Sequence, residues 1–299
     1  MLIIRKLLSL FNTLKFILNH PLNRKNKIIA LTRYIKWHIG VRLNPYSIIY
    51  PYAEKTKLII SKSMHGATGN LFCGLDEFED MAFLLHFLRE DDLFIDIGAN
   101  IGSYTLLASN EVGAEAISIE PIPETYKRLK TNLLLNNLDH RVDALNIGLG
   151  RKSGVLRFTK SLDSENHVAT VNEIDTIDVE IKKFDDIISI QKITLIKIDV
   201  EGYETEVLTG MSNALLNPLL KGIIIELNGS GNRYGFEEDE IHRKLLSHNF
   251  KPLFYSPFER KLVNSDSYGS YNTIYIRDVD FVDSRVTSAR KFKILDQEI

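Results

Sequence analysis

The chain has 299 residues, of which 44% are hydrophobic and 25% are charged, a composition typical of a globular protein with a substantial core. Its net charge of −2 gives no reason to expect a nucleic acid partner. Cys73 is the single cysteine, which excludes an intrachain disulfide and favours a reducing compartment, so we predict a cytoplasmic protein.

The first 50 residues are basic, and no acidic residue occurs before Glu54. Apolar side chains recur at helical spacing over 7–18, but Lys15 interrupts them, and no uncharged run reaches the ~20 residues that span a bilayer. No cleavage site typical of a signal peptide follows an apolar segment. We expect residues 1–75 to form helices and short strands packed on the main domain. The alternative is peripheral contact between a basic amphipathic helix and an anionic membrane.

From residue 76 onward, helical and strand patterns alternate along the chain. Helical spacing predicts helices over 77–88, from Ser103 onward, and over 125–137, 204–210 and 237–248. Apolar runs predict core strands over 93–97, 116–120, 142–147, 193–200 and 222–227, hairpin-like strands within 153–181, and antiparallel edge strands over 251–256 and 272–277. The fold class is therefore α/β, with a Rossmann-like, doubly wound, mostly parallel sheet in a domain over 76–280 and a charged tail over 281–299.

Ligands of such sheets lie beyond the carboxyl ends of the strands, where the stretch FIDIGANIGSYT (94–105) places a turn from Gly98 to Gly102. Asn100 stands where a dinucleotide fold would have its middle glycine. The glycines let the backbone approach a ligand, and the N–H groups of the next helix attract a negative group such as a carboxylate. Asp96 suits an ammonium group, and Glu120 ends the second strand, where an acid often binds ribose hydroxyls.

A ligand with a carboxylate, an amine and a ribose is S-adenosylmethionine, for which Tyr104, Thr105 and Asn146 are further candidate contacts. The alternatives are that Asp96 caps the helix and that Glu120 is a solvated strand end.

A second unusual stretch is LIKIDVEGYE, residues 195–204. The period of two in a strand places Lys197, Asp199 and Glu201 on one side. Because a central parallel strand is usually apolar on both faces, these charges need partners or a function. The next strand ends similarly, at Glu226 and Asn228.

The motifs DIGANIGSYT, Glu120-Pro121, KIDVEGYETEVLTG and IIIELN together resemble the FkbM family of S-adenosylmethionine-dependent methyltransferases, over roughly residues 60 to 250. The resemblance implies a class I methyltransferase fold and methylation of a hydroxyl on a sugar, polyketide or similar metabolite, which suits polysaccharide biosynthesis. The first 50 and last 20 residues match no motif of the family.

An aliphatic hydroxyl needs a base or a metal before it attacks a methyl group. We expect Asp199 and Glu201 to orient or deprotonate it, with Glu226 and Lys197 assisting. A divalent metal held by Asp199, Glu226 and Asn228, or an internal network of ion pairs with Lys197, is an alternative that we do not favour, and we predict no metal. His65 and Asn228 are weaker substrate candidates.

Two other functions remain as alternatives. An N-methyltransferase is less favoured, because Asp199-Val200-Glu201-Gly202 lacks the prolines common in nitrogen-methylating sites. A catalytically silent scaffold that binds the cofactor is the alternative outside enzymes. The acceptor and the oligomeric state are not readable from the sequence.

Overall fold

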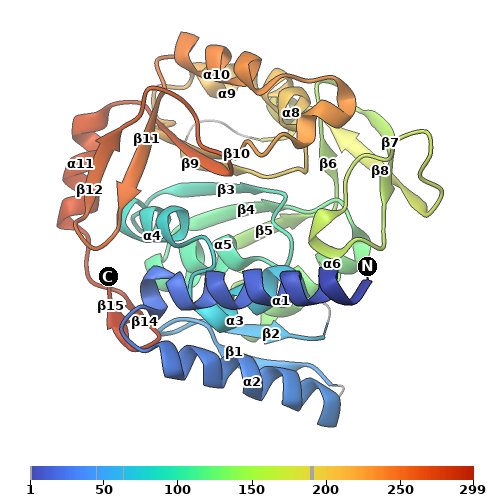
Figure 1. The fold of residues 1–299 in the computed structure, drawn as a ribbon. Helices are drawn as coiled ribbons and strands as arrows, with labels where there is room; N and C mark the ends of the chain where they lie inside the picture. The colour runs from blue at the N-terminus through green and yellow to red at the C-terminus, as the bar shows by residue number, and fades with distance from the viewer. Residues whose placement is uncertain (1, 45, 63, 189–191) are drawn as a thin grey trace.

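The computed structural model describes residues 2–44, 46–62, 64–188 and 192–299, apart from the side chains of residues 2–7 and 65. At its centre lies an eight-stranded sheet (Figure 1). The strand order is β12-β11-β13-β10-β9-β3-β4-β5. The strands are β3 (Leu93–Ile97), β4 (Glu115–Ile119), β5 (Val142–Leu145), β9 (Ile193–Ile198), β10 (Gly222–Glu226), β11 (Lys251–Ser256), β12 (Lys261–Asn264) and β13 (Asn272–Ile276).

Five neighbouring strands, from β10 to β5, are parallel. The chain builds β3, β4 and β5 in one direction and then returns to place β9 on the other side of β3. The strand order therefore reverses between β3 and β9, which is where doubly wound sheets bind their ligands. This topology confirms the fold class that the sequence predicts.

The antiparallel end of the sheet differs from expectation. We predicted 251–256 and 272–277 as edge strands, but β13 pairs with β10 and β11, and β11 pairs with β13 and β12, so both are internal. The edge is β12, which the sequence analysis missed. A turn at 257–260, with Arg260 in the left-handed region at φ 51°, folds the chain back along β11.

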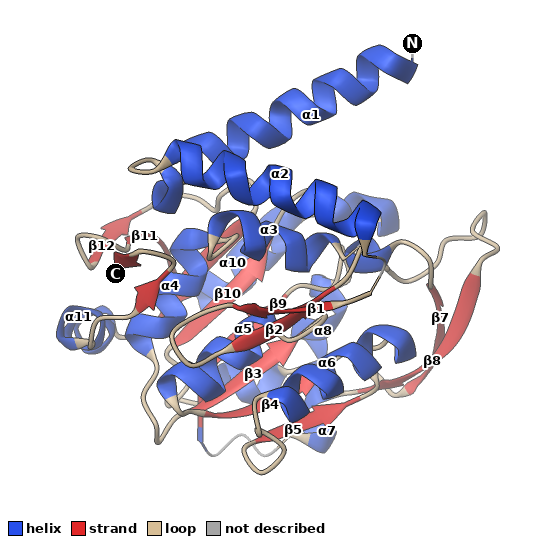
Figure 2. Ribbon diagram, turned by 90° about the horizontal axis from the view of Figure 1, so that it is seen from below, coloured by secondary structure: helices blue, strands red, loops and turns tan. Residues whose placement is uncertain are grey.

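Helices cover both faces of the sheet (Figures 1 and 2). One face carries α4 (Phe78–Phe87), α5 (Ser103–Leu106), its π-helical continuation η2 (Leu107–Val112), α6 (Pro123–Leu135) and α11 (Val279–Ser288). The other carries α7 (Phe184–Ile187), α8 (Glu204–Gly210), α9 (Ser212–Leu216) and α10 (Glu238–Ser247). Each face of the sheet has its own hydrophobic core, and the side chains of β9 alternate between them. Leu195 lies in the core under α4, and Ile196 and Ile198 lie in the core under α8. Burial on both faces explains why these strands read as continuous apolar runs.

The N-terminal segment forms the predicted helices and short strands: α1 (Leu2–Asn19), η1 (Pro21–Asn23), α2 (Lys27–Leu43), β1 (Ile48–Pro51), β2 (Lys57–Ile60) and α3 (His65–Cys73). It is tied to the sheet domain through α6, where Asn132 Oδ1 accepts from the Ile59 N–H at 2.9 Å and Asn136 Oδ1 from the Lys57 N–H at 2.8 Å. Within the described residues, every helix is too short or too polar to cross a membrane.

A smaller sheet lies beside the carboxyl ends of the central strands (Figure 1). Its order is β6-β8-β7, with β6 (Gly148–Leu149), β7 (Gly154–Thr159) and β8 (Thr176–Lys182). The hairpin-like strands expected within 153–181 are present as β7 and β8, and between them residues 167–171 form only one bridge, from Val168 to Phe158. Two 3₁₀ turns, η3 (Asp163–Glu165) and η5 (Ser230–Tyr234), flank this region.

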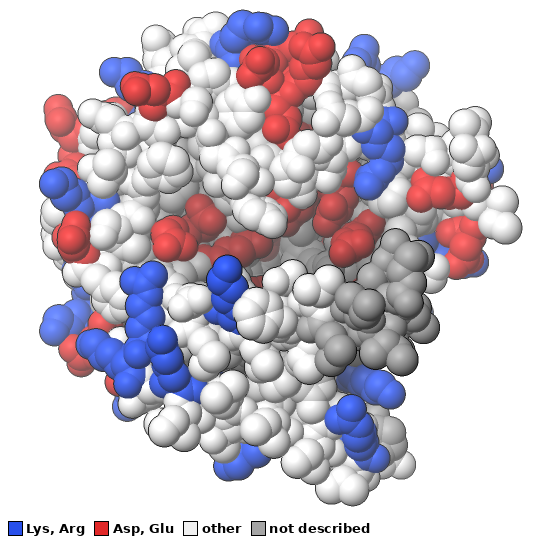
Figure 3. All heavy atoms as spheres, viewed as in Figure 1, with Lys and Arg blue, Asp and Glu red and all other residues white. Residues whose placement is uncertain are grey.

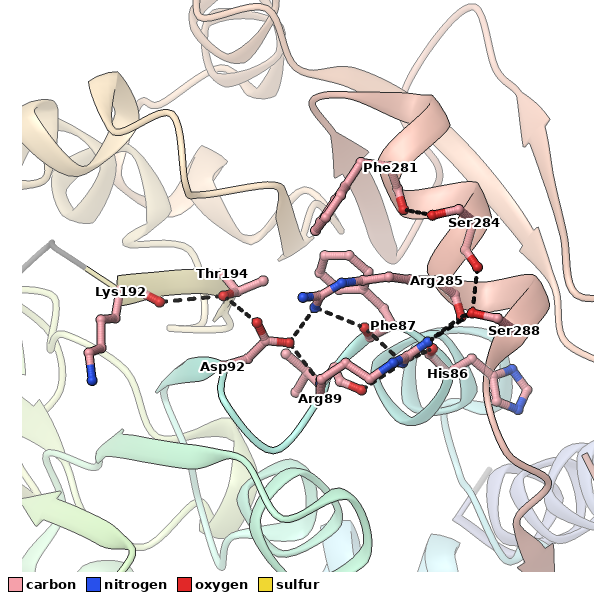
Figure 4. A network of polar contacts seen from close by, with 11 residues as sticks. His86, Phe87, Arg89, Asp92, Lys192, Thr194, Phe281, Ser284, Arg285 and Ser288 are labelled. Carbon is pink, nitrogen blue, oxygen red and sulfur yellow. Dashed lines mark hydrogen bonds and ion pairs between the residues drawn. The ribbon is translucent and has the colours of Figure 1, made fainter.

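Residues 281–299 pack on the domain rather than forming a tail outside it. Helix α11 is followed by the hairpin of β14 (Lys293–Ile294) and β15 (Gln297–Glu298). Figure 4 shows what holds α11: Arg285 forms an ion pair with Asp92, which precedes β3, and its guanidinium lies near the rings of Phe87 and Phe281. Asp92 also accepts from Thr194 Oγ1 at 2.9 Å, so one carboxylate joins α11 to β3 and β9.

Candidate functional site

A cleft of about 580 Å³ lies at the carboxyl ends of β3, β4, β9 and β10, next to the point where the strand order reverses. Its volume lies in the range of small-molecule sites. In Figure 3, acidic side chains gather around a hollow across the middle of the molecule. Most of the residues predicted for the site line this cleft: Asp96, Gly98, Asn100, Tyr104, Glu120, Lys197, Asp199, Glu201, Glu226 and Asn228.

The turn after β3 requires its unusual residues. Gly98 has φ 79°, and a Cβ there would clash with the backbone oxygen of Asp199, so the turns after β3 and β9 touch. Asn100 is also in the left-handed region, at φ 50°, which asparagine tolerates better than most residues. This conformation accounts for the asparagine found where a dinucleotide fold would have glycine.

Asp96 is buried, and its Oδ2 accepts hydrogen bonds from the backbone N–H of Thr105 at 3.1 Å and from Thr105 Oγ1 at 2.6 Å. The alternative of helix capping is thus realised for one carboxylate oxygen. Burial raises the pKa of Asp96, while Lys197 and the bonds from Thr105 act in the opposite direction. Thr105 itself is buried behind the turn and does not line the cleft.

Glu120 faces the cleft just beyond β4, and its side chain connects the turn after β3 to the turn after β4. Its Oε2 accepts from the Asn100 N–H at 3.0 Å, and its Oε1 from the Ile122 N–H at 2.9 Å. Its exposure is only 6%, so the alternative of a solvated strand end is wrong. Burial raises the pKa of Glu120 to about 7, although both backbone bonds oppose the shift.

Three carboxylates converge past the ends of β9 and β10: Asp199, Glu201 and Glu226 each have an oxygen within 4.8 Å of the other two. Burial, and next the charge of Asp199, raises the pKa of Glu201 to about 8 and that of Glu226 to about 9. Oε2 of Glu226 is buried and has no hydrogen-bond partner among the described residues. At neutral pH, Glu201 and Glu226 are therefore mostly protonated, and it is their ionised fraction that can accept a proton.

Lys197 supplies the pairing that the charged strand requires. Its Nζ donates to Asp199 Oδ2 at 2.7 Å and lies 4.8 Å from the centre of the Tyr104 ring. Burial alone would lower the pKa of Lys197, but Asp199, Glu77 and Asp96 together raise it above its ordinary value. Lys197 is therefore charged, and its charge lies directly against the Asp199 carboxyl group.

Glu201 reaches the cluster differently from the way its sequence position suggests. Strand β9 ends at Ile198, and Glu201 lies in a left-handed turn at φ 54°, followed by Gly202 at φ 101°. The period of two therefore does not extend to Glu201. The turn is held by Glu204 Oε1, which accepts from the N–H groups of Val200 and Gly202, both at 3.1 Å.

Of the remaining predicted residues, Asn146 and Gly102 do not line the cleft. Asn146 Nδ2 donates to the carbonyls of Glu120 and Pro121, at 2.8 and 3.0 Å, and Ile147 lines the cleft in its place. Gly102, at φ 92°, begins the helix and lies behind the lining. The side chain of His65 lies outside the described residues.

Sequence reasoning missed Glu77 and Asn272. Glu77 Oε2 accepts from the Tyr104 hydroxyl and from Asn272 Nδ2 at 2.9 Å, and Glu77 also lines the cleft. These two residues come from the start of α4 and from β13, and no local pattern joins them. Arg233, in the loop over 229–236 that follows β10, donates to the Glu201 carbonyl at 3.1 Å and also lines the cleft.

A divalent cation would find three oxygen ligands in Asp199, Glu201 and Glu226, so the metal alternative moves from Asn228 to Glu201. Without a metal ion, the same three acids, with Lys197 paired to Asp199, suit proton transfer equally well.

The Methyltransferase FkbM domain family matches residues 96–252. Hexuronic acid methyltransferase AglP of Haloferax volcanii is 32% identical over 148 residues, which cover 48% of this chain and 59% of AglP. The 31-O-demethyl-FK506 methyltransferase FkbM of Streptomyces tacrolimicus is 26% identical over 211 residues, covering 58% of this chain and 78% of that protein. The chain thus spans less than two thirds of AglP.

Among solved structures, the precorrin-6y C5,15-methyltransferase of Geobacter metallireducens has a TM-score of 0.42 and 12% sequence identity, covering 74% of this chain and 94% of that one.

Proposed function

The chain belongs to the FkbM methyltransferase family, whose cofactor is S-adenosylmethionine, and from this premise we propose that it methylates a hydroxyl group on a sugar, a glycan or a secondary metabolite. The observation that carries the proposal is the placement of the three carboxylates Asp199, Glu201 and Glu226 in the same cleft as the turn at Gly98. One end of the cleft suits a nucleoside, and the other suits deprotonation of an alcohol.

The residues present fit the cofactor. The cleft is large enough for it, and Glu120 and the Gly98–Asn100 turn lie at adjacent strand ends on one side. Glu120 would bind the ribose hydroxyls, because each of its oxygens has one lone pair beyond the bond from Asn100 or Ile122. Asp96 and Tyr104 line the neighbouring part of the cleft, where the amino-acid end would lie. When bound, S-adenosylmethionine supplies an electrophilic methyl group on a positively charged sulfur.

The chain's own residues position the acceptor and receive its proton. As the acceptor oxygen takes the methyl group, its proton passes to a carboxylate of the cluster. A base works best when its pKa lies near the working pH, and burial brings Glu201 and Glu226 close to that range. Lys197 Nζ donates to Asp199 Oδ2 beside them at 2.7 Å, and the other oxygen of Asp199 can accept a hydrogen bond from the hydroxyl.

The names of the relatives support the acceptor class. AglP is a hexuronic acid methyltransferase, and FkbM acts on 31-O-demethyl-FK506. The turn after β9 has no proline of the kind common in nitrogen-methylating sites, which again favours oxygen over nitrogen. A hydroxylated glycan is therefore the first acceptor to test, with polysaccharide biosynthesis as its setting.

Two variants separate the cofactor half of the cleft from the acceptor half. Asp199→Asn should reduce kcat by about 100-fold or more, and leave the affinity for S-adenosylhomocysteine nearly unchanged, because the loss falls on proton transfer. Glu120→Ala should instead weaken the binding of that product and change kcat less at saturation. Asp280→Asn, an exposed acid on α11, is the control and should change neither quantity.

The measurements are calorimetric titration with S-adenosylhomocysteine and release of that product over a panel of hydroxylated sugars. Full turnover by Asp199→Asn would place the base elsewhere. Tight cofactor binding by the unaltered chain without turnover on any acceptor would favour the scaffold alternative.

A further inference from the structure

The outward face of α2 carries an uncovered apolar stripe. Ile28, Ile35, Ile39 and Leu43 follow one another at spacings of seven, four and four residues, which places them along one side of the helix. Their exposed fractions are 80%, 53%, 53% and 81%, so the rest of the chain leaves more than half of the surface of each residue uncovered.

The inward face of the same helix is apolar as well. Ala30 is fully buried, and Tyr34 and Trp37 pack against the main core. The isoleucine stripe is therefore a second apolar face of α2, in addition to the face that packs on the core. Isolated exposed apolar residues are common on proteins, but a continuous stripe usually marks a contact surface.

Helix α1 extends this surface. Ile17 is buried, whereas Leu8, Leu10, Phe11 and Phe16 are between 42% and 64% exposed. In Figure 2, α1 and α2 lie together on one side of the molecule, and the N-terminal part of α1 projects past the body. We call the exposed apolar residues of α1 and α2 the N-terminal apolar surface.

The charge around this surface has one sign. Residues 1–53 contain no acid, and six bases among the described side chains of residues 8–43 are exposed: Lys15, Arg24, Lys25, Lys27, Lys36 and Arg42. Arg33 is the exception, since it turns inward to the carbonyl of Phe72 at 2.9 Å. Exposed apolar residues bordered by lysine and arginine are typical of helices that lie in the boundary layer of a bilayer.

We propose that the N-terminal apolar surface docks on an anionic lipid bilayer, with the isoleucine stripe of α2 in the boundary of the acyl chains and the bases on the head groups. The helices lie along the bilayer surface and do not cross it. A second copy of the chain is a poorer occupant, because pairing these surfaces would bring two acid-free basic segments together.

The test uses the full chain, with vesicles of phosphatidylglycerol and phosphatidylcholine in equal parts and vesicles of phosphatidylcholine alone. The protein should sediment with the first and not with the second, and high salt should release it, because screening weakens attraction to the charged head groups. Ile28→Ser combined with Ile35→Ser and Leu43→Ser should weaken binding about tenfold or more. Lys25→Gln combined with Lys27→Gln and Lys36→Gln should do the same.

The matched control is Val171→Ser combined with Ile174→Ser, which replaces two side chains that are 93% and 95% exposed in the loop between β7 and β8. It should bind vesicles as the unaltered chain does. All variants alter exposed side chains, so their unfolding midpoints should agree.

Equal binding by the isoleucine variant and the unaltered chain would overturn the proposal. So would failure of the unaltered chain to sediment, or a dimer in solution that the isoleucine variant converts to a monomer without any vesicle binding. Each measurement is made without substrate, so it is independent of methyl transfer.

Discussion

Glu226 shows how a single side chain can be costly for stability and useful for chemistry. Its carboxyl is mostly buried beside Asp199 and Glu201, and its Oε2 has no partner among the described residues. Lys197 forms a direct hydrogen bond to Asp199 at 2.7 Å. Glu226 has no such bond to Lys197, and burial raises its pKa to about 9, so it keeps its proton at neutral pH. Poised carboxyl groups of this kind are common where acids act in catalysis.

Glu226→Gln should make the protein more stable at alkaline pH. The pKa of Glu226 is raised to about 9 by burial, and next by Asp199, so the folded state holds the proton more tightly than the unfolded state. Its favourable contribution is complete below the ordinary glutamate pKa and is lost as pH rises toward about 9. Glutamine does not titrate, so the variant should gain about 1–2 kcal/mol over the unaltered chain between pH 5 and pH 9, after allowance for partial exposure.

Urea unfolding at both pH values measures this gain. The gain should appear together with a loss of turnover, as expected of a residue that serves the reaction at a cost in stability. A stability difference that does not vary with pH would show that Glu226 titrates normally.

At the scale of elements, the turns after β3 and β9 are built against each other through Gly98. Gly98→Ala would place a methyl group on the Asp199 carbonyl oxygen and would also impose a left-handed backbone on alanine. We expect a loss of about 3 kcal/mol or more, together with displacement of Asp199, because one of the two turns must move. The measurement is urea unfolding with cofactor titration.

Gly235→Ala is its control. Gly235 has φ 75°, similar to Gly98, but nothing lies within 4 Å of its Cβ position. That variant reports the backbone strain alone, for which we expect about 1 kcal/mol. Equal losses in the two variants would mean that the contact between the turns contributes nothing.

The elements that the sequence predicts correctly are those whose burial is decided locally. β3, β9 and β10 are apolar runs ended by a turn or a charge, and α8 and α10 begin where those turns end. Lys197 and Asp199 were placed together by the period of two in a strand, and their bond confirms it.

The elements that were missed depend on distant partners. α11 buries only Val282 and Val286 and owes its place to the pairing of Arg285 with Asp92, nearly 200 residues away in the chain. Glu77 enters the cleft because Asn272 and Tyr104 hold it there. Such contacts leave no periodic pattern in the sequence.

At the scale of the whole molecule, the C-terminal hairpin packs against the N-terminal segment. The C-terminal hairpin lies beside η1, where Gln297 Nε2 donates to the Leu22 carbonyl at 2.6 Å and Asn26 Nδ2 donates to Asp296 Oδ2 at 2.5 Å. Phe292, Ile294 and Ile299 are buried in the same core as α3 and α4. The N-terminal helices are therefore part of the domain's core on their inner side, even though their outer side is uncovered.

Ile294→Ala should consequently destabilise the entire protein and not only the hairpin. Ile294 is fully buried, with its Cγ2 lying close to Gly74 at the end of α3, so its truncation leaves a cavity between the C-terminal hairpin and α3. We expect a loss of about 2–4 kcal/mol in one cooperative transition, measured by urea unfolding followed through both Trp37 fluorescence and far-ultraviolet circular dichroism. Lys293→Ala, the exposed neighbour in the same strand, should change the free energy of unfolding by less than about 0.5 kcal/mol. If the Trp37 signal shifts alone while the circular dichroism transition stays in place, the N-terminal helices unfold as a separate unit, and they do not share one cooperative core with the C-terminal hairpin.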